Sequence, residues 1–102
     1  MRTAAEEATA LLRSLADADR LLVLCQLSHG ERCMDELEKA LSIEELALSQ
    51  HMNVLKNLEL VASRVRSKRI YYSIRDPRVL GVLLSLYRLF CAPRGERRPD
   101  SA

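Results

Sequence analysis

The chain has 102 residues, of which 48% are hydrophobic and 4% aromatic, with three cysteines and a formal net charge of +2 at pH 7. This length fits one domain with a modest core, and such a domain often buries further apolar surface against a second copy. The net charge is too small to indicate nucleic-acid binding by itself, so the distribution of charge has to decide. No stretch is long and apolar enough to span a membrane. The three cysteines occur without a signal-peptide pattern, which favours the reducing cytosol. In that compartment thiols more often react or bind metal than form structural disulfides.

The N-terminal part of the chain predicts two helices. One covers residues 3–15 and has four apolar residues on one face: Ala8, Leu11, Leu12 and Leu15. Asp17 is a good N-cap for the second helix, over residues 18–28, which His29-Gly30 ends because glycine is the usual left-handed cap. Residues 31–34 form a short connection that can be extended.

A helix-turn-helix pattern follows. A short helix is predicted over residues 35–41 and a longer one over residues 44–58, with a tight break at Ser42-Ile43. The longer helix has four residues expected to face inward: Leu48, Met52, Leu55 and Leu58.

The apolar period then changes from that of a helix to that of a strand. Residues 60–66 and 69–74 alternate apolar and polar side chains around Ser67-Lys68, which predicts a β-hairpin with a turn weaker than Asn-Gly.

Asp76-Pro77 predicts the start of the last helix, over residues 77–91. One face of it carries Leu80, Leu83, Leu84, Tyr87, Phe90 and Cys91, and further apolar residues make the helix apolar nearly all round. Such a helix needs burial on two sides, which a partner subunit can supply. Residues 1–91 are therefore expected to form one DNA-binding and dimerisation domain, and residues 92–102 a disordered tail.

Two groups of residues are candidates for DNA contact. The hairpin concentrates positive charge suited to phosphates at Arg64, Arg66, Lys68 and Arg69. The helix over 44–58 offers outward polar residues that can contact bases or phosphates: Ser49, Gln50, Asn53, Lys56 and Asn57. A polar, solvated helix face is the alternative, and the neighbouring basic hairpin favours DNA binding.

The run LEKALSIEELALSQHMNVLKNLELV followed by RIYYSIRDPR resembles the ArsR/SmtB family of bacterial winged-helix repressors. The resemblance covers residues 11 to 91. It implies a mostly α-helical winged helix-turn-helix with a β-hairpin wing, in which the helix bearing Ser49-Gln50-His51 reads the operator. It also implies a homodimer formed by the first and last helices, which binds an imperfect palindrome of double-stranded DNA and releases it when an inducer is sensed.

This chain departs from the family pattern at three places. Glu44-Glu45 stand where the reading helix usually opens with Ser-Gln, and Ala47 replaces a residue whose hydroxyl often contacts DNA. Glu59 replaces a glycine and is an awkward residue wherever a left-handed conformation is needed. These changes bear on operator sequence and affinity rather than on the fold.

The metal sites of the family are incomplete here. The Cys-x-Cys stretch of one site type corresponds to residues 31–37, where Cys33 remains and Asp35 replaces the second thiolate, a poor pair for soft metals. The other site type uses Asp and His on the last helix, which here has no histidine. His51 is expected to pack or hydrogen-bond within the reading helix. We therefore expect no bound metal and no cofactor.

Cys25 in RLLVLCQL and Cys91 in LYRLFC resemble the cysteine pair of the thiol-based BigR/SqrR/HlyU-like branch. That resemblance implies sensing of persulfides and polysulfides, with the two cysteines joined by a disulfide or a longer sulfur chain. A direct disulfide needs the two Cα atoms within about 7 Å of each other. If the cysteines lie farther apart, inserted sulfur atoms could bridge them, whereas peroxide inserts no sulfur and could not. Two buried core cysteines are the alternative.

Three other functions stay open. One is a repressor that responds to metal through Cys33 and Asp35. Another is a thiol oxidoreductase, which the lack of a Cys-x-x-Cys pair disfavours. The last is a winged helix that has lost inducible DNA binding and serves as a protein-interaction module, for which Glu44-Glu45 is the best support. The preferred function is a non-enzymatic, cytosolic repressor released from DNA by reactive sulfur.

Overall fold

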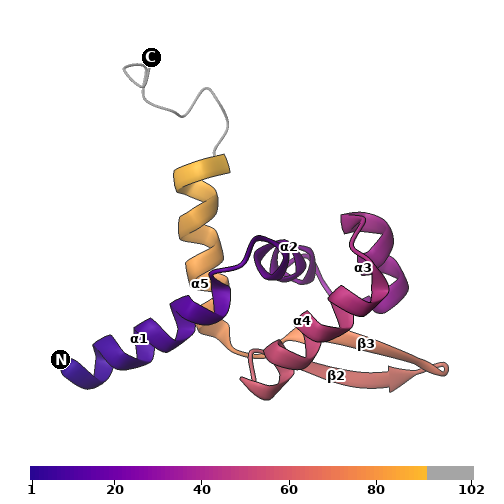
Figure 1. The fold of residues 1–102 in the computed structure, drawn as a ribbon, viewed down its shortest axis with the longest axis horizontal. Helices are drawn as coiled ribbons and strands as arrows, with labels where there is room; N and C mark the ends of the chain where they lie inside the picture. The colour runs from indigo at the N-terminus through magenta and orange to yellow at the C-terminus, as the bar shows by residue number, and fades with distance from the viewer. Residues whose placement is uncertain (92–102) are drawn as a thin grey trace, which may run out of the picture.

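The computed structural model describes residues 1–91, and its helix-turn-helix lies beside the hairpin, on the side away from the N-terminal helix (Figure 1). The elements in chain order are α1 (Arg2–Leu15), α2 (Ala18–Leu27), β1 (Arg32–Cys33), α3 (Met34–Leu41), α4 (Glu45–Asn57), β2 (Val61–Arg66), β3 (Arg69–Ile74), α5 (Pro77–Leu86) and the π-helical turn η1 (Tyr87–Cys91). The predicted order of helices and hairpin is confirmed. The predicted tail, residues 92–102, lies outside the described residues.

Local capping fixes where two of the helices begin. The Oδ1 atom of Asp17 accepts the backbone N–H of Arg20 at 3.1 Å and caps α2. The Oδ1 atom of Asp76 accepts the backbone N–H of Arg78 at 2.9 Å, and Pro77 takes the first helical position of α5, where no N–H is required. Both predicted caps are confirmed.

The end of α4 depends on a left-handed residue. The backbone N–H of Glu59 donates to the Lys56 carbonyl at 2.9 Å, and that of Leu60 donates to the Leu55 carbonyl at 3.0 Å. These two bonds form a Schellman motif, whose central residue must be left-handed, and Glu59 has φ 60°. Glu59 thus takes a conformation that a glycine would adopt at lower cost.

The sheet contains one strand more than the predicted hairpin. Its antiparallel order is β1-β3-β2, and the extended connection after α2 supplies β1, with Cys33 opposite Tyr71. Arg66 pairs with Arg69 at the end of the hairpin, and Ser67 and Lys68 both have positive φ, 52° and 67°. Two positive φ values are typical of a type I′ turn, which matches the twist of the strands.

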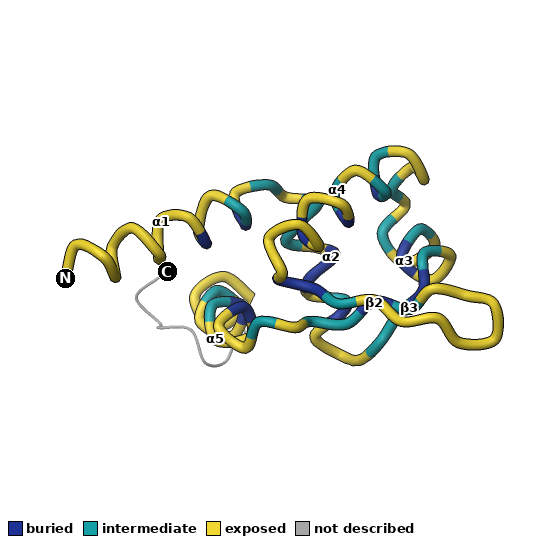
Figure 2. The backbone as a smooth tube through the Cα atoms, turned by 90° about the horizontal axis from the view of Figure 1, so that it is seen from below, coloured by how far each residue is buried: buried dark blue, intermediate teal, exposed yellow. Residues whose placement is uncertain are grey.

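The core lies where α2, α3 and α4 meet the base of the hairpin and α5 (Figure 2). Its fully buried members include Val23, Leu24, Leu37, Leu48, Met52, Leu55 and Val79. Leu58 was predicted to face inward, and this is wrong: α4 ends at Asn57, and Leu58 at the cap is 48% exposed.

The last helix also differs from its prediction. It is helical to Cys91 as expected, but its final five residues form a π-helical turn rather than an α-helix. Val79 and Leu83 are its buried residues, whereas most of the apolar side chains around them are exposed in the single chain. Within residues 1–91, no helix combines the length and the apolar character that crossing a bilayer requires.

Candidate nucleic-acid interface and thiol pair

The reading helix, α4, separates its apolar and polar side chains onto different faces. Leu48, Met52 and Leu55 are buried against the core. Gln50, Asn53, Lys56 and Asn57, all predicted to face outward, are exposed, and Ser49 is half-buried. Amide and ammonium groups of this kind can bind base edges and phosphates in a major groove.

His51 lies on the flank of α4 that faces α2. Its side chain is 17% exposed, and its Nε2 atom lies 3.7 Å from an Asp19 carboxylate oxygen and 3.9 Å from one of Asp17. The imidazole therefore has neighbours from another helix, which the sequence did not reveal. A DNA contact by His51 stays a prediction.

The start of the reading helix carries the two acidic residues that depart from the family pattern. Glu44 is the N-cap residue and makes no capping hydrogen bond with its side chain, Glu45 lies in the first turn, and both are exposed. Their charges suit the positive end of the helix and would repel a DNA phosphate placed there.

The wing, residues 61–74, exposes all four of the predicted basic side chains: Arg64, Arg66, Lys68 and Arg69. Arg64 nevertheless forms an ion pair within the molecule. Its Nε and Nη2 atoms donate to the two carboxylate oxygens of Glu31 at 2.6 and 2.7 Å. This pairing lowers the pKa of the Glu31 carboxyl group, chiefly through the hydrogen bond from Arg64. Arg64 thus fixes the wing to the segment before β1, a role that the sequence did not indicate.

The remaining wing cations differ in their surroundings. The Arg66 guanidinium lies over the Tyr71 ring, 4.5 Å from its centroid. An Nη1 atom of Arg69 lies 3.8 Å from an Asp35 oxygen. Lys68, at the turn, has no ion pair with any residue in the described part of the chain. Among the four basic side chains predicted to contact phosphates, Lys68 therefore interacts least with other groups of the protein.

Cys25 and Cys91 are both free thiols and both exposed. Cys25, on α2, lines a groove of about 380 Å³ between the end of α2 and α5. The other lining residues are Ser28, His29, Leu80, Leu83, Leu84 and Tyr87. In sequence, Cys91 follows Tyr87 by four positions, and Tyr87 follows Leu84 by three, so these side chains share one stripe of the last helix.

The environment of Cys25 disfavours its thiolate form. The pKa of the Cys25 thiol is raised, first by burial and second by the negative charge of Cys91. A negative charge near a thiol disfavours its thiolate form. Cys25 lies on α2, and Cys91 is the last residue of η1, which continues α5.

Comparison with known proteins identifies the family. The sequence profile of bacterial regulatory proteins of the arsR family matches residues 17–63. The biofilm growth-associated repressor of Agrobacterium fabrum is 37% identical over 93 residues, which cover 91% of this chain and 80% of that protein. The chain belongs to the arsR family.

Solved structures of arsR-type regulators have the same fold. Reduced HlyU from Vibrio cholerae matches with a TM-score of 0.84 at 32% identity, covering 89% of this chain and 96% of that one. The transcriptional repressor BigR from Xylella fastidiosa matches with a TM-score of 0.81 at 33% identity, covering 96% and 95%. These relatives are transcriptional regulators, and this arsR-family chain is a transcriptional regulator of the same kind.

Cys33, the third thiol of this arsR-family chain, has a different environment. It is 3% exposed at the start of α3, and its Sγ atom lies 3.9 Å from Nη1 of Arg69. Asp35, its partner in the alternative metal site, is 67% exposed and lies near the same guanidinium. A guanidinium between a thiol and a carboxylate disfavours a cation there, so this geometry does not favour metal sensing through Cys33.

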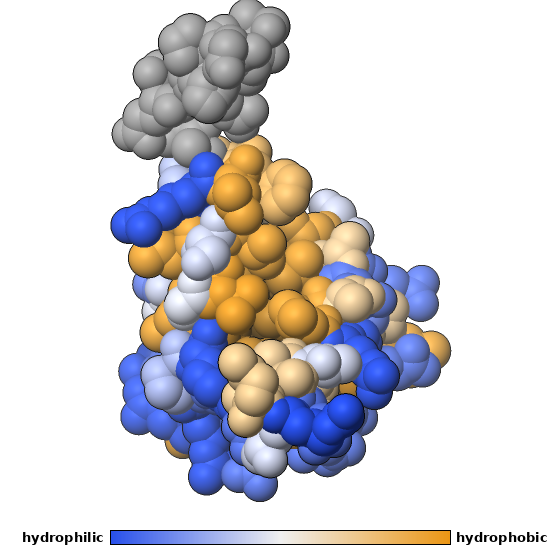
Figure 3. Space-filling view, turned by 90° about the vertical axis from the view of Figure 1, so that its left-hand side faces the viewer, coloured by the Kyte–Doolittle hydropathy of each residue, from blue (hydrophilic) through white to orange (hydrophobic). Residues whose placement is uncertain are grey.

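A second feature of the arsR-family chain is the apolar surface on the side where α1 and α5 lie (Figure 3). Leu12 on α1 is 57% exposed, and Leu84 on α5 and Leu89 on η1 are 50% and 73% exposed. Exposed apolar side chains that gather on one side of a molecule, here called the α1/α5 face, are typical of a protein–protein interface. It is the surface that the predicted dimer would bury.

Proposed function

We propose that this regulator is a homodimeric repressor that releases its operator when reactive sulfur species join Cys25 to Cys91 within one subunit. Residues 1–91 would act as one DNA-binding and dimerisation domain. The observation that supports the proposal is that two free, exposed thiols lie on packed elements: Cys25 lines the groove between α2 and α5, and Cys91 ends the turn η1 that continues α5.

Operator binding follows from the reading helix and the wing. Dimerisation through the α1/α5 face would present two copies of α4 to successive major grooves, about 34 Å apart. Gln50 and Asn53, which are exposed on α4, would contact bases, and the exposed Lys68 would contact a phosphate. An operator with two related half-sites, an imperfect palindrome, matches such a dimer.

The chemistry of release starts from a persulfide, RSSH. One cysteine thiolate attacks its outer sulfur and displaces RSH, which leaves a cysteine persulfide. The second thiolate then attacks the inner sulfur of this persulfide, the Sγ atom of the first cysteine, and displaces hydrogen sulfide, forming a disulfide. In total, two thiols and one RSSH give a disulfide, RSH and H₂S, so the persulfide is the oxidant. Each further RSSH inserts one more sulfur into the bridge and releases one more RSH.

The length of the bridge provides selectivity. A disulfide requires Cα atoms within about 7 Å, whereas a longer sulfur chain spans a wider gap without moving the helices. Peroxide adds no sulfur to a bridge. The regulator would therefore respond to persulfide more readily than to peroxide.

The bridge would act on DNA binding through α2. This helix packs against α3 of the helix-turn-helix and against α5 of the dimer side. Tying Cys25 of α2 to Cys91 beyond α5 fixes the angle between these two parts. A small rotation of each reading helix moves the pair out of register with the two grooves, which weakens binding.

Intact mass spectrometry combined with an operator-binding assay tests the proposal. After treatment with glutathione persulfide, we expect whole sulfur atoms to be gained, two thiols to be lost, and DNA to be released. Hydrogen peroxide should produce neither the sulfur gain nor release.

Cysteine variants complete this test. Cys25→Ser and Cys91→Ser should bind DNA and fail to release it, whereas Cys33→Ala should respond like the unaltered protein. Release by persulfide in Cys25→Ser or Cys91→Ser would refute the thiol mechanism. An unaltered protein that does not bind its own promoter at low salt would refute the repressor function.

A further inference from the structure

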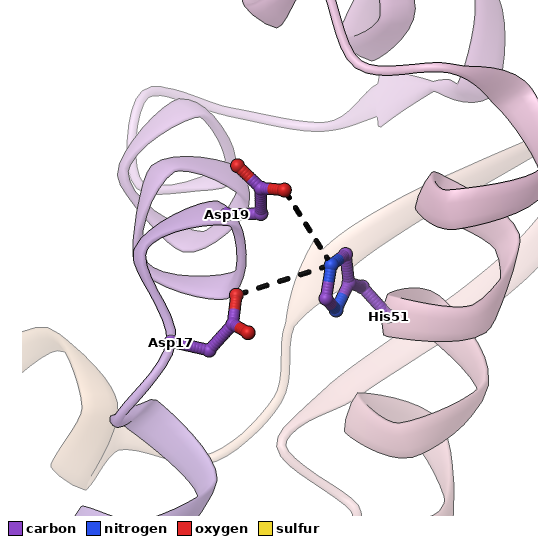
Figure 4. A group of neighbouring side chains, drawn as sticks. All are labelled: Asp17, Asp19 and His51. Atoms are coloured by element: carbon purple, nitrogen blue, oxygen red, sulfur yellow. Dashed lines mark ion pairs between the residues drawn. The ribbon is translucent and has the colours of Figure 1, made fainter.

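A group of three metal-binding side chains lies between α2 and the reading helix, apart from the thiol pair. Asp17 and Asp19 project from the start of α2 toward His51 on α4 (Figure 4). One oxygen from each carboxylate and one imidazole nitrogen all lie within 4.8 Å of one another, and all three residues are half-buried. Two helices that meet only through folding thus supply one set of donor atoms.

The spacing of these atoms suits an ion between them better than direct hydrogen bonds. The Nε2 atom of His51 is 3.7 Å from Asp19 Oδ2 and 3.9 Å from Asp17 Oδ1. Both separations exceed the range of an N–H···O hydrogen bond, about 2.7–3.2 Å. Ligands bound tetrahedrally at about 2.0–2.1 Å from zinc lie roughly 3.4 Å apart, so small inward movements of both carboxylates would complete the geometry.

The donor set selects a chemical class of cation. One imidazole with two carboxylates suits a borderline divalent ion such as Zn²⁺, whereas Mg²⁺ and Ca²⁺ prefer oxygen ligands alone. Asp17 keeps its capping bond from the Arg20 N–H at 3.1 Å, because a carboxylate oxygen has a second lone pair for a metal.

We propose that Asp17, Asp19 and His51 bind a zinc-class divalent cation that links α2 to the reading helix, with water completing the coordination. This site differs from both metal-site types considered in the sequence analysis, at residues 31–37 and on the last helix. It uses no thiol and does not depend on the persulfide mechanism. Sequence alone predicted no metal ligation by His51, because its partners belong to a different helix.

Zinc titration of the full chain, followed by NMR of the imidazole C–H signals, tests the site. The chain has two histidines, so a His29→Gln variant assigns the His51 signals. We expect the His51 signals to shift and to saturate at one zinc ion per chain. Unfolding temperature should rise with zinc concentration, because the ion binds only the folded state.

Asp19→Asn is the decisive variant, because Asp19 is 47% exposed and makes no capping bond to the helix, so its loss leaves the fold intact. We expect it to weaken zinc binding at His51 at least tenfold and to remove most of the increase in unfolding temperature. His51 signals that stay fixed in excess zinc would overturn the proposal. So would an equal response in Asp19→Asn, or a shift confined to His29, which would place the ion beside Cys25 instead.

Discussion

Replacement of Lys68 by glutamine would test the role of the wing most sharply. Lys68 lies at the turn of the hairpin and has no ion pair within the described residues, so its charge is available to a phosphate. Arg64, four positions earlier on β2, already shares both oxygens of Glu31. The two cations should therefore contribute very differently to DNA binding, although the sequence alone treats them alike.

The expected effect follows from counterion release. Each phosphate contact adds about 0.9 to the slope of log K against log salt, so losing one contact per subunit lowers the slope of a dimer by about 1.8. If the unaltered protein and Lys68→Gln bind DNA equally near 1 M salt, the variant should bind about 30-fold more weakly at ~0.15 M salt. The double variant Glu31→Gln/Arg64→Gln removes an ion pair without changing net charge and should leave the slope unchanged.

Fluorescence anisotropy of a labelled promoter fragment across a range of salt concentrations measures both slopes. Arg13→Gln, on α1, is the matched control because it removes an exposed charge far from the wing. The reasoning is refuted if Lys68→Gln leaves the slope unchanged. It is also refuted if the Glu31/Arg64 double variant loses as much slope as Lys68→Gln.

Three further predictions concern the thiol pair, the end of α4 and the core. Because the pKa of the Cys25 thiol is raised by burial and by Cys91, its alkylation should be slow at neutral pH and reach half its maximum above the ordinary pH of about 8.5. Cys91→Ser should lower that midpoint, and a midpoint that Cys91→Ser leaves in place would contradict the coupling. Glu59→Gly should stabilise the fold by about 1 kcal/mol in urea unfolding, since φ is 60° there, and a destabilised variant would disprove the strain. Leu24→Ala should cost about 2–5 kcal/mol in the same assay because Leu24 is fully buried, and a loss below ~1 kcal/mol would show a looser core.

Features encoded by neighbouring residues could be predicted from the sequence. Asp17 and Asp76 cap their helices through bonds to residues two or three positions away. The alternation of residues 69–74 sets the hairpin in the same local way. The family resemblance added a prediction that local patterns do not contain, namely that Cys25 and Cys91 act together.

Features that depend on tertiary contacts were missed. Glu31 and Arg64 meet only because β1 joins the sheet beside the hairpin, and nothing in either local sequence indicates the pair. The direction of His51 depends on the position of α2. Leu58 has the right period for the core, but the left-handed turn at Glu59 ends the helix before it. Helical period alone does not show where a helix stops.

The pairing of the two thiols within one subunit is tested most directly by isotope labelling. Dimers assembled from equal amounts of ¹⁴N and ¹⁵N chains would be treated with glutathione persulfide, digested without reduction, and analysed by mass spectrometry. We predict bridged peptides that contain Cys25 and Cys91 from chains of the same isotope only. Bridged peptides of mixed isotope, or no bridge between these cysteines when DNA is released, would contradict the account.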